Sequence, residues 1–226
     1  MMAITGIVVA GGKGTRLGGC DKAFLRIDDE PIIVRTLRTL RSLCSQTVVV
    51  TQHPERFRAF QTEVTTDVFP GCGPLAGIHA GLRAAREAYA FVVACDMPSL
   101  DPEVVRFLVE RVRTDPERGP DAVVPQWEGD VEPLHAVYAA RCAAGIECCL
   151  RRGEHSVRDF LQTVRVDHVP EVVLARLPGA ARSFTNVNTP AELARLLRGS
   201  RRCDDDAGAH GTDERVPAAA HARSGR

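Results

Sequence analysis

Residues 4–22 read ITGIVVAGGKGTRLGGCDK, a short apolar run followed at once by a glycine-rich loop. The apolar run, Ile4–Ala10, ends in glycines, which is typical of a buried strand in a parallel sheet. Because glycine permits positive φ angles and close approach of the backbone, the amide N–H groups of the loop can surround phosphate oxygens. The stretch therefore predicts an α/β fold that begins with a strand and a phosphate-binding loop.

The spacing of the glycines excludes two common nucleotide-binding motifs. A Walker A loop has serine or threonine directly after its lysine, whereas Lys13 is followed by a glycine. A dinucleotide-binding fingerprint that starts at Gly12 needs glycine five positions later, where the chain has Leu17. A long glycine loop with Arg16 and a terminal Lys22 remains, and these cations suit a triphosphate. A flexible surface loop with solvated cations is the alternative.

Strand and helix patterns alternate along the rest of the chain. Apolar runs predict strands at 47–51, 63–66, 89–95, 121–124, 134–138 and 164–168. Helical spacing predicts helices at 31–43, 54–61, 74–87, 101–113, 139–150 and 156–163, and a capping box at 189–192 predicts a last helix. This alternation favours a Rossmann-like three-layer α/β/α fold with a mostly parallel sheet. We assign residues 1–198 to one domain and predict a disordered tail at 199–226, where periodicity ends.

Composition and charge exclude several classes of function. The 226 residues carry a formal net charge of zero, so no electrostatic footprint for nucleic acid or an anionic membrane is present. No apolar stretch approaches the roughly 20 residues that span a bilayer, and the N-terminus lacks a basic leader, so we expect a cytoplasmic protein. The eight cysteines include no C-x-x-C pair, which favours reduced, small apolar residues over a zinc site or a disulfide framework.

Asp96 follows directly after the apolar run 89–95. Ligands of an open parallel sheet bind beyond the carboxyl ends of its strands, so this carboxylate is predicted to face a binding site. One carboxylate can hold Mg²⁺ there while phosphate oxygens and water complete the octahedron. A turn aspartate is the alternative for Asp96. Asp101, which precedes Pro102 at a predicted helix start, is interpreted as an N-cap instead.

Three further segments are candidates for substrate contacts. The sequence GPLAG at 73–77 opens a predicted helix, whose positive end could approach a nucleotide or could be a plain turn. Asn186 and Asn188 flank Val187 in a segment predicted to be extended, so both amides would face one way and could bind a heterocycle such as a pterin. Turn-forming asparagines are the alternative. The sequence EPLH at 132–135 either borders an acceptor pocket or is an ordinary strand entry.

Four motifs in order resemble those of the molybdenum cofactor guanylyltransferases. They are the loop with Val9-Ala10-Gly11-Gly12, Arg16-Leu17-Gly18 and Asp21-Lys22, then Gly73-Pro74-Leu75-Ala76-Gly77, Cys95-Asp96-Met97-Pro98 and Asn186-Val187-Asn188-Thr189-Pro190. The resemblance covers about residues 4–197. It implies a nucleotidyltransferase fold and transfer of GMP from GTP to the phosphate of molybdenum-loaded molybdopterin, with Mg²⁺ as cofactor. Proteins of molybdenum cofactor biosynthesis and molybdoenzymes are then candidate partners.

The resemblance also assigns roles to individual residues. It places Arg16, Lys22 and Asp96 in catalysis, with Asp96 as the metal ligand, and Asn186 and Asn188 at the acceptor. The implied nucleotide-binding residues are Val9, Ala10, Gly11, Gly12, Lys22, Asp67, Gly73 and Asp96. The Asp67 carboxylate suits either the N–H edge of guanine or the ribose hydroxyls, and a turn residue is the alternative.

The expected chemistry is attack of the acceptor phosphate on the α-phosphorus of GTP, with pyrophosphate leaving. A phosphate monoester has a second pKa of about 6, so no dedicated general base is required. The same reaction with CTP, a sugar-phosphate nucleotidyltransferase and a nucleotide-binding regulatory module without turnover are the rival functions. The sugar-phosphate enzymes usually have proline before the lysine, where this chain has Asp21.

Overall fold

The computed structural model describes residues 3–11, 22–112, 119–187 and 192. The strands of its main sheet are β1 (Thr5–Val9), β4 (Gln46–Val50), β5 (Glu63–Thr65), β6 (Tyr89–Ala94), β7 (Ala122–Trp127), β8 (Asp130–Val131), β9 (His135–Ala139) and β10 (Val166–Val169). Their order is β10-β7-β9-β6-β1-β4-β5, with β8 paired to β7. A separate small hairpin joins β2 (Arg26–Ile27) to β3 (Glu30–Pro31).

The sheet is mostly parallel, as predicted. β1 lies at its centre, pairs in parallel with β4 and β6, and has all five residues buried. β9 is antiparallel to both of its neighbours, β6 and β7. The carboxyl ends of β1, β4, β5 and β6 therefore meet at one edge of the sheet, where a ligand of an α/β fold is expected.

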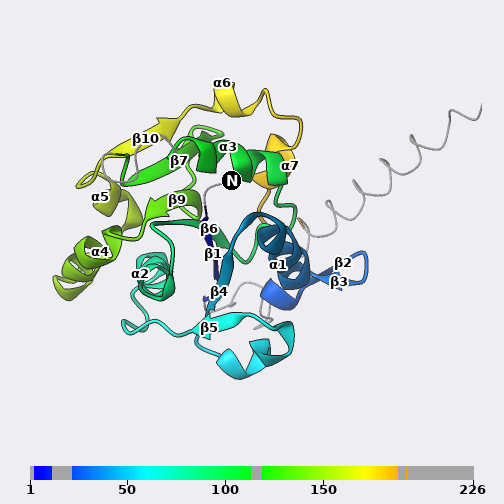
Figure 1. The fold of residues 1–226 in the computed structure, drawn as a ribbon, viewed down its shortest axis with the longest axis horizontal. Coiled ribbons are helices and arrows are strands. Elements are labelled where there is room, and N and C mark those ends of the chain that lie inside the picture. Colours follow the sequence, from blue (N-terminus) through cyan, green and yellow to red (C-terminus); the bar gives the residue numbers. More distant parts are fainter. Residues whose placement is uncertain (1–2, 12–21, 113–118, 188–191, 193–226) are drawn as a thin grey trace, which may run out of the picture.

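Helices cover both faces of the sheet. They are α1 (Ile32–Leu43), α2 (Pro74–Ala84), α3 (Pro102–Glu110), α4 (Cys142–Arg151), α5 (Val157–Leu161), α6 (Glu171–Leu174) and α7 (Ala180–Ser183), with 3-10 turns η2 (Lys22–Phe24) and η3 (Pro54–Phe60). In Figure 1, α2, α4 and α5 lie on one side of the sheet and α1, α3 and α7 on the other. The predicted three-layer α/β/α architecture is confirmed.

Two glycines allow α2 to pack directly on β1. A Cβ atom on Gly77 would lie 2.7 Å from Val9 Cγ1, and one on Gly81 would lie 2.5 Å from Ile7 Cγ2. Both separations are too short for a non-bonded contact of a Cβ atom, so any other residue would push the helix and strand apart at these positions. The close approach places the first turn of α2 beside the carboxyl end of β1.

Some predicted elements differ from the structure. The helix predicted at 54–61 is the 3-10 helix η3 (Pro54–Phe60), and the sequence did not predict the short elements η2, β2, β3, β8, α6 and α7. The segment 186–188 was predicted to be strand-like, but Asn186 and Val187, which the structure describes, form no strand, and the Val187 N–H donates instead to the Asp96 carbonyl in a loop (2.9 Å). The capping-box residue Thr189 and the predicted tail lie outside the described residues.

Two further expectations from the sequence concern the burial of the cysteines and the absence of a membrane-spanning stretch. Among the cysteines that the structure describes, Cys142 and Cys149 are buried as expected, whereas Cys148 is exposed. Within the described ranges, no helix has the length and apolar character needed to cross a membrane.

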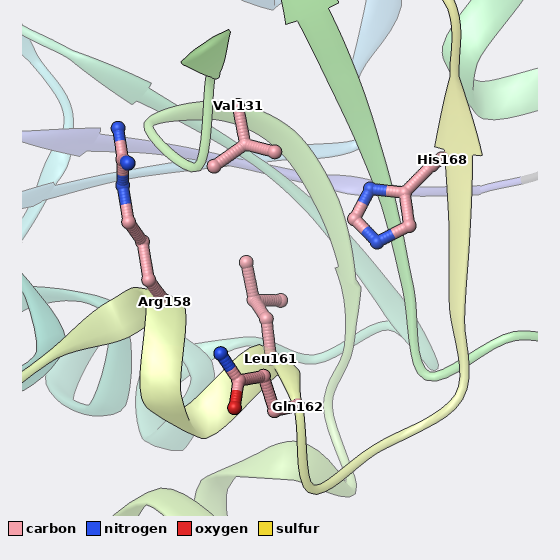
Figure 2. A pocket seen from close by; sticks show the side chains of 5 residues that line it. All are labelled: Val131, Arg158, Leu161, Gln162 and His168. Atoms are coloured by element: carbon pink, nitrogen blue, oxygen red, sulfur yellow. The ribbon is translucent and has the colours of Figure 1, made fainter.

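A cavity of about 270 Å³ lies between β8, α5 and β10. Figure 2 shows Arg158 and His168 on opposite sides of it, with Val131, Leu161 and Gln162 completing the lining. Arg158 pairs with Asp130 at 2.8 Å, and Arg151 and Arg152 also form exposed ion pairs. These arginines are therefore engaged at the protein surface.

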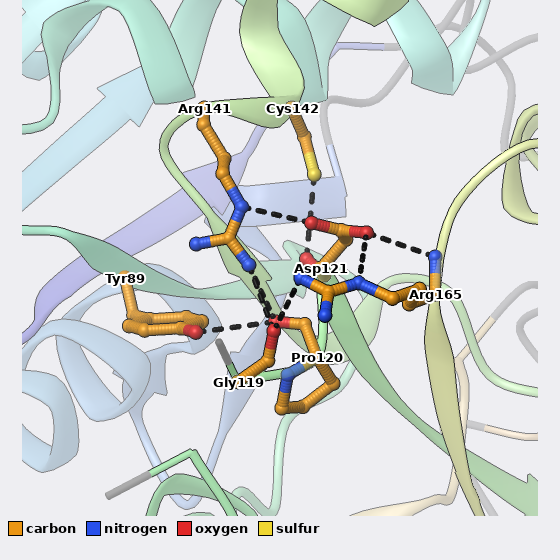
Figure 3. Close-up of polar contacts among 7 residues, drawn as sticks. All are labelled: Tyr89, Gly119, Pro120, Asp121, Arg141, Cys142 and Arg165. Carbon is orange, nitrogen blue, oxygen red and sulfur yellow. Dashed lines mark hydrogen bonds and ion pairs between the residues drawn. The ribbon is translucent and has the colours of Figure 1, made fainter. Parts of the chain in front are cut away.

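Asp121 joins three elements at the edge of the sheet opposite the carboxyl ends of β1 and β6. Its carboxylate accepts hydrogen bonds from Arg141 Nε (2.8 Å) and from the Arg165 backbone N–H (2.9 Å), and Cys142 Sγ donates to its carbonyl (Figure 3). Burial raises the pKa of Asp121, but the hydrogen bonds from Arg165 and Arg141 outweigh it and hold that pKa below its ordinary value. The cluster ties the start of β7 to α4 and β10.

Candidate active site

Lys22 and Asp96 meet at the carboxyl edge of the sheet. Lys22 begins η2, and Asp96 lies just beyond β6. Lys22 Nζ donates to Asp96 Oδ2 at 2.9 Å, and about a fifth of each side chain is exposed (23% and 20%). The structure therefore brings together the predicted phosphate-binding cation and the predicted metal ligand.

The loop after β6 is held by the segment that contains Asn186. The Asp96 carbonyl accepts from Val187 N at 2.9 Å, and the Asp101 N–H donates to Ser183 Oγ at 3.0 Å. Asn186 is therefore the neighbour in sequence of a residue that is bonded to the Asp96 backbone. Its Oδ1 atom is buried and accepts no hydrogen bond from any residue within the described ranges. Asn188 lies outside those ranges.

Asp101 is the helix N-cap that the sequence predicts. Its side chain accepts from the backbone N–H groups of Glu103 and Val104, at the start of α3. The carboxylate thereby satisfies two N–H groups that have no partner inside the helix. Asp101 is accounted for by this structural role, in contrast to Asp96 five residues earlier.

Asp67 and Gly73 lie on the other side of β1, in the connection between β5 and α2. Asp67 Oδ2 accepts from Gln52 Nε2 at 2.7 Å, while its Oδ1 atom is buried and has no hydrogen-bond partner among the described residues. Gly73 has a φ angle of 73° and precedes the first turn of α2. A carboxylate oxygen that lacks a donor is suited to the N–H or hydroxyl group of a ligand.

The first residues of the glycine loop differ in their surroundings: Val9 and Ala10 bond to neighbouring strand ends, whereas Gly11 is exposed. Val9 O accepts from Cys95 N, and Ala10 N donates to Val50 O, so these backbone groups join the strand ends. Gly11 is exposed, and a Cβ atom there would meet nothing within 4 Å. Gly11 thus leaves open space at the edge of the sheet. Gly12 and Arg16 lie outside the described residues.

Glu132 is a second acidic group within electrostatic reach of Asp96. Burial first, and then the charges of Asp130, Asp96 and Glu128, raise the pKa of Glu132 to about 7. Among the described residues, no cluster of three or more His, Cys, Asp or Glu side chains could enclose a metal. Mg²⁺ needs only one or two protein carboxylates when phosphates supply the other oxygens. Asp96 therefore fits a magnesium site that is completed by the nucleotide.

His135 is a buried residue whose connecting role the sequence did not reveal. Its Nδ1 atom lies 3.3 Å from Met97 Sδ and its Nε2 atom 3.4 Å from Ser183 Oγ. Burial lowers the pKa of His135 to about 3, so the ring is neutral. His135 links the loop after β6 to the segment 183–187. Only the sequence EPLH at 132–135 pointed toward this region.

A central glycine loop, an aspartate beyond the neighbouring strand and a mostly parallel sheet define a Rossmann-like nucleotidyltransferase. The family model for the MobA-like NTP transferase domain matches residues 6–170, and the chain belongs to this family. The molybdenum cofactor guanylyltransferase of Desulfosudis oleivorans is 37% identical over 85% of this chain and 94% of its own. A probable molybdenum cofactor guanylyltransferase of Pelotomaculum thermopropionicum is 36% identical over 86% and 92%.

A solved structure supports the same grouping. Molybdopterin-guanine dinucleotide biosynthesis protein A from Archaeoglobus fulgidus superposes with a TM-score of 0.76 and 28% identity. The match covers 88% of this chain and 100% of that chain. The resemblance found in the four sequence motifs therefore extends over most of the fold.

Proposed function

We propose that the protein transfers GMP from GTP to the phosphate of molybdenum-molybdopterin and releases pyrophosphate. The product is the guanine dinucleotide form of the molybdenum cofactor. Relatives named molybdenum cofactor guanylyltransferase, matched over more than nine-tenths of their length, support the reaction. The observation that carries the site assignment is the contact of Lys22 with Asp96 at the carboxyl edge of the sheet.

The chemical step is an in-line displacement at the α-phosphorus. An oxygen of the acceptor phosphate forms the new P–O bond as the bond to the bridging oxygen of pyrophosphate breaks, and the electron pair leaves with pyrophosphate. The acceptor phosphate is largely dianionic at neutral pH, with a second pKa of about 6, so no side chain has to remove a proton. Catalysis then depends on positioning and on charge neutralisation.

Lys22 and Asp96 have different roles in this charge neutralisation. Asp96 would hold Mg²⁺, which neutralises triphosphate charge when bound. Lys22 supplies a point charge for phosphate oxygens, together with Arg16 from the glycine loop. In the structure Lys22 compensates the Asp96 carboxylate, so neither charge is left unpaired before substrates bind.

The base is assigned to the connection between β5 and α2. The buried Asp67 Oδ1 lacks a donor among the described residues, and the N1–H and N2–H₂ groups of guanine can supply one. Cytosine has no ring N–H beside its amino group, so a carboxylate that reads the base edge favours GTP over CTP. If Asp67 binds the ribose instead, it does not discriminate between them.

Pyrophosphate release with each of four nucleoside triphosphates, with and without molybdenum-molybdopterin, tests the proposal. We expect release that requires GTP and the acceptor together. Preference for CTP would make the protein a cytidylyltransferase, and GTP binding without acceptor-dependent release would make it a regulatory module. We place the reaction in the cytoplasm, with suppliers of the acceptor and molybdoenzymes as candidate protein partners.

A further inference from the structure

The hairpin of β7 and β8 presents one of its faces to the segment 183–187. Its register pairs Gln126 with Val131 and Trp127 with Asp130, and Glu132 N donates to Pro125 O at 2.9 Å. Directly opposed residues of an antiparallel pair share a face, so Trp127 and Glu132 lie on the same side of the hairpin. Val131 lies on the other side, where it lines the cavity of Figure 2.

Trp127 is the aromatic end of this face. Its ring stacks on Phe184 with centroids 5.0 Å apart and planes 21° apart. Phe184 is almost fully buried, and its other neighbour is His135 at 4.5 Å, whereas Trp127 is partly exposed. The stack holds the indole against Phe184, which precedes Asn186 by two residues.

Two polar groups accompany this aromatic face: Glu132 shares the face of the hairpin, and Asn186 follows Phe184 by two residues. The Leu134 carbonyl accepts from Ala94 N, so the connection from Glu132 to β9 runs beside the end of β6, the strand that leads to Asp96. Asn186 is joined to the same loop through the bond of Val187 N to Asp96 O. Both groups offer acceptor oxygens, and the Asn186 Oδ1 atom has no donor within the described ranges.

We propose that Trp127, Glu132 and Asn186 form the subsite for the fused heterocyclic ring of the acceptor, a pterin. The ring lies against the indole of Trp127, and its amino-amide edge donates N–H groups to the Glu132 carboxylate and to Asn186 Oδ1. This inference rests on the proposed function, because it names how the acceptor of that reaction is recognised.

The chemistry of the surface suits the ring of the acceptor better than its phosphate. Glu128, Asp130 and Glu132 gather acidic groups on this side of the site, and Arg158 offsets the charge of Asp130 at 2.8 Å. Ionised Glu128 and Glu132 disfavour phosphate and attract N–H donors. Adjacent N–H groups can bond a carboxylate in two parallel hydrogen bonds. The acceptor is thereby oriented with its ring on Trp127 and its phosphate toward Lys22, where the reaction takes place.

Intrinsic fluorescence reports on the subsite directly, because Trp127 is the sole tryptophan of the chain. We titrate the full-length protein with 6-hydroxymethylpterin, after correction for absorption by the probe, and expect saturable quenching. At pH 8, above the Glu132 pKa of about 7, Glu132→Gln should weaken this binding about tenfold or more, which is the usual loss for one charged hydrogen-bond partner. Glu128→Gln removes the same charge at the exposed hairpin tip and should bind the pterin as wild type does.

GTP is the discriminating ligand, since guanine carries the same amino-amide edge as a pterin. Saturable quenching by GTP alone, without quenching by the pterin, would assign this face to the nucleotide base and overturn the proposal. Absence of quenching by both ligands would also overturn it.

Kinetics with molybdenum-molybdopterin separate recognition from folding. Trp127→Ala should raise the KM for the acceptor about tenfold or more, because loss of an aromatic stacking partner costs about 1–3 kcal/mol, a 5- to 150-fold change. Trp127→Phe should restore most of the affinity, and the KM for GTP should stay unchanged in both variants. Unchanged acceptor KM in Trp127→Ala and Glu132→Gln would refute the subsite in an active enzyme. If the wild type binds pterin but releases no pyrophosphate, the proposed function fails and the subsite stands.

Discussion

Lys22 Nζ lies 2.9 Å from Asp96 Oδ2, although 74 positions separate the two residues. The glycine loop ends at one of them and the β6 strand leads to the other. Their contact joins the phosphate-binding and metal-binding halves of the proposed site. It also implies that a ligand which binds Asp96 has to compete with, or rearrange, the Lys22 ammonium group.

Removal of either charge should reduce turnover far more than stability. Lys22→Ala and Asp96→Asn are each expected to lower kcat about 10²- to 10³-fold, as for other groups that stabilise charge in a transition state. The pair is partly exposed, so the midpoint of thermal unfolding should change little. Pyrophosphate release and thermal unfolding of the same samples measure both effects. Arg106→Ala, which removes an exposed cation on α3, is the control and should retain wild-type turnover.

The buried His135 should make stability depend on pH. Its pKa is about 3 in the folded protein and about 6.5 when unfolded, so only the unfolded chain binds the proton between these values. The free energy of unfolding should therefore fall as the pH drops below about 6.5, by about 1.4 kcal/mol per pH unit for this one group. Urea unfolding between pH 4 and 8 measures the slope.

His135→Gln removes the titrating group and is the comparison for this slope. The variant should be less stable at pH 8, because it loses contacts with Met97 and Ser183. Its stability should decline less steeply with acidification than that of the wild type. An equal slope in both proteins would show that His135 is not the group responsible.

Gly77→Ala tests the close packing of α2 on β1. The added Cβ atom would lie 2.7 Å from Val9 Cγ1, so helix and strand must separate, at a cost of about 1–3 kcal/mol. The shift also displaces the connection that carries Asp67 and Gly73, so the KM for GTP should rise. Gly145→Ala in α4 is the matched control, since its Cβ would lie 3.5 Å from Phe160 and the substitution favours helix.

Asp121→Asn tests the cluster at the far edge of the sheet. The depressed pKa of Asp121 means that its stabilising effect is complete well above 3.8 and is lost as the pH falls through the lower folded value. We expect Asp121→Asn to lower stability at pH 7 by about 1–3 kcal/mol. Activity per folded molecule should not change, because the cluster lies opposite the candidate site. A selective loss of turnover at full folding would contradict this separation.

Much of the fold follows from local patterns. The strand 4–10, the helices that begin at Pro74 and Pro102, and the Asp101 cap were all predicted, because apolar spacing and capping depend on neighbours in sequence. The short elements α6 and α7 have four residues each, too few for a periodic pattern. Packing against the rest of the protein stabilises them, so the sequence around them carries little signal.

The candidate site likewise combines features that depend on local sequence with contacts that depend on the tertiary structure. The sequence alone determined that a glycine loop follows a buried strand and that Asp96 ends another, since both features are local. Only the tertiary structure decided that Lys22 contacts Asp96, that Val187 bonds to the Asp96 carbonyl, and that Trp127 and Glu132 share a face. Strand order, register and the return of the segment 183–187 bring these groups together. Such contacts depend on chain closure over long separations, which no short-range pattern encodes.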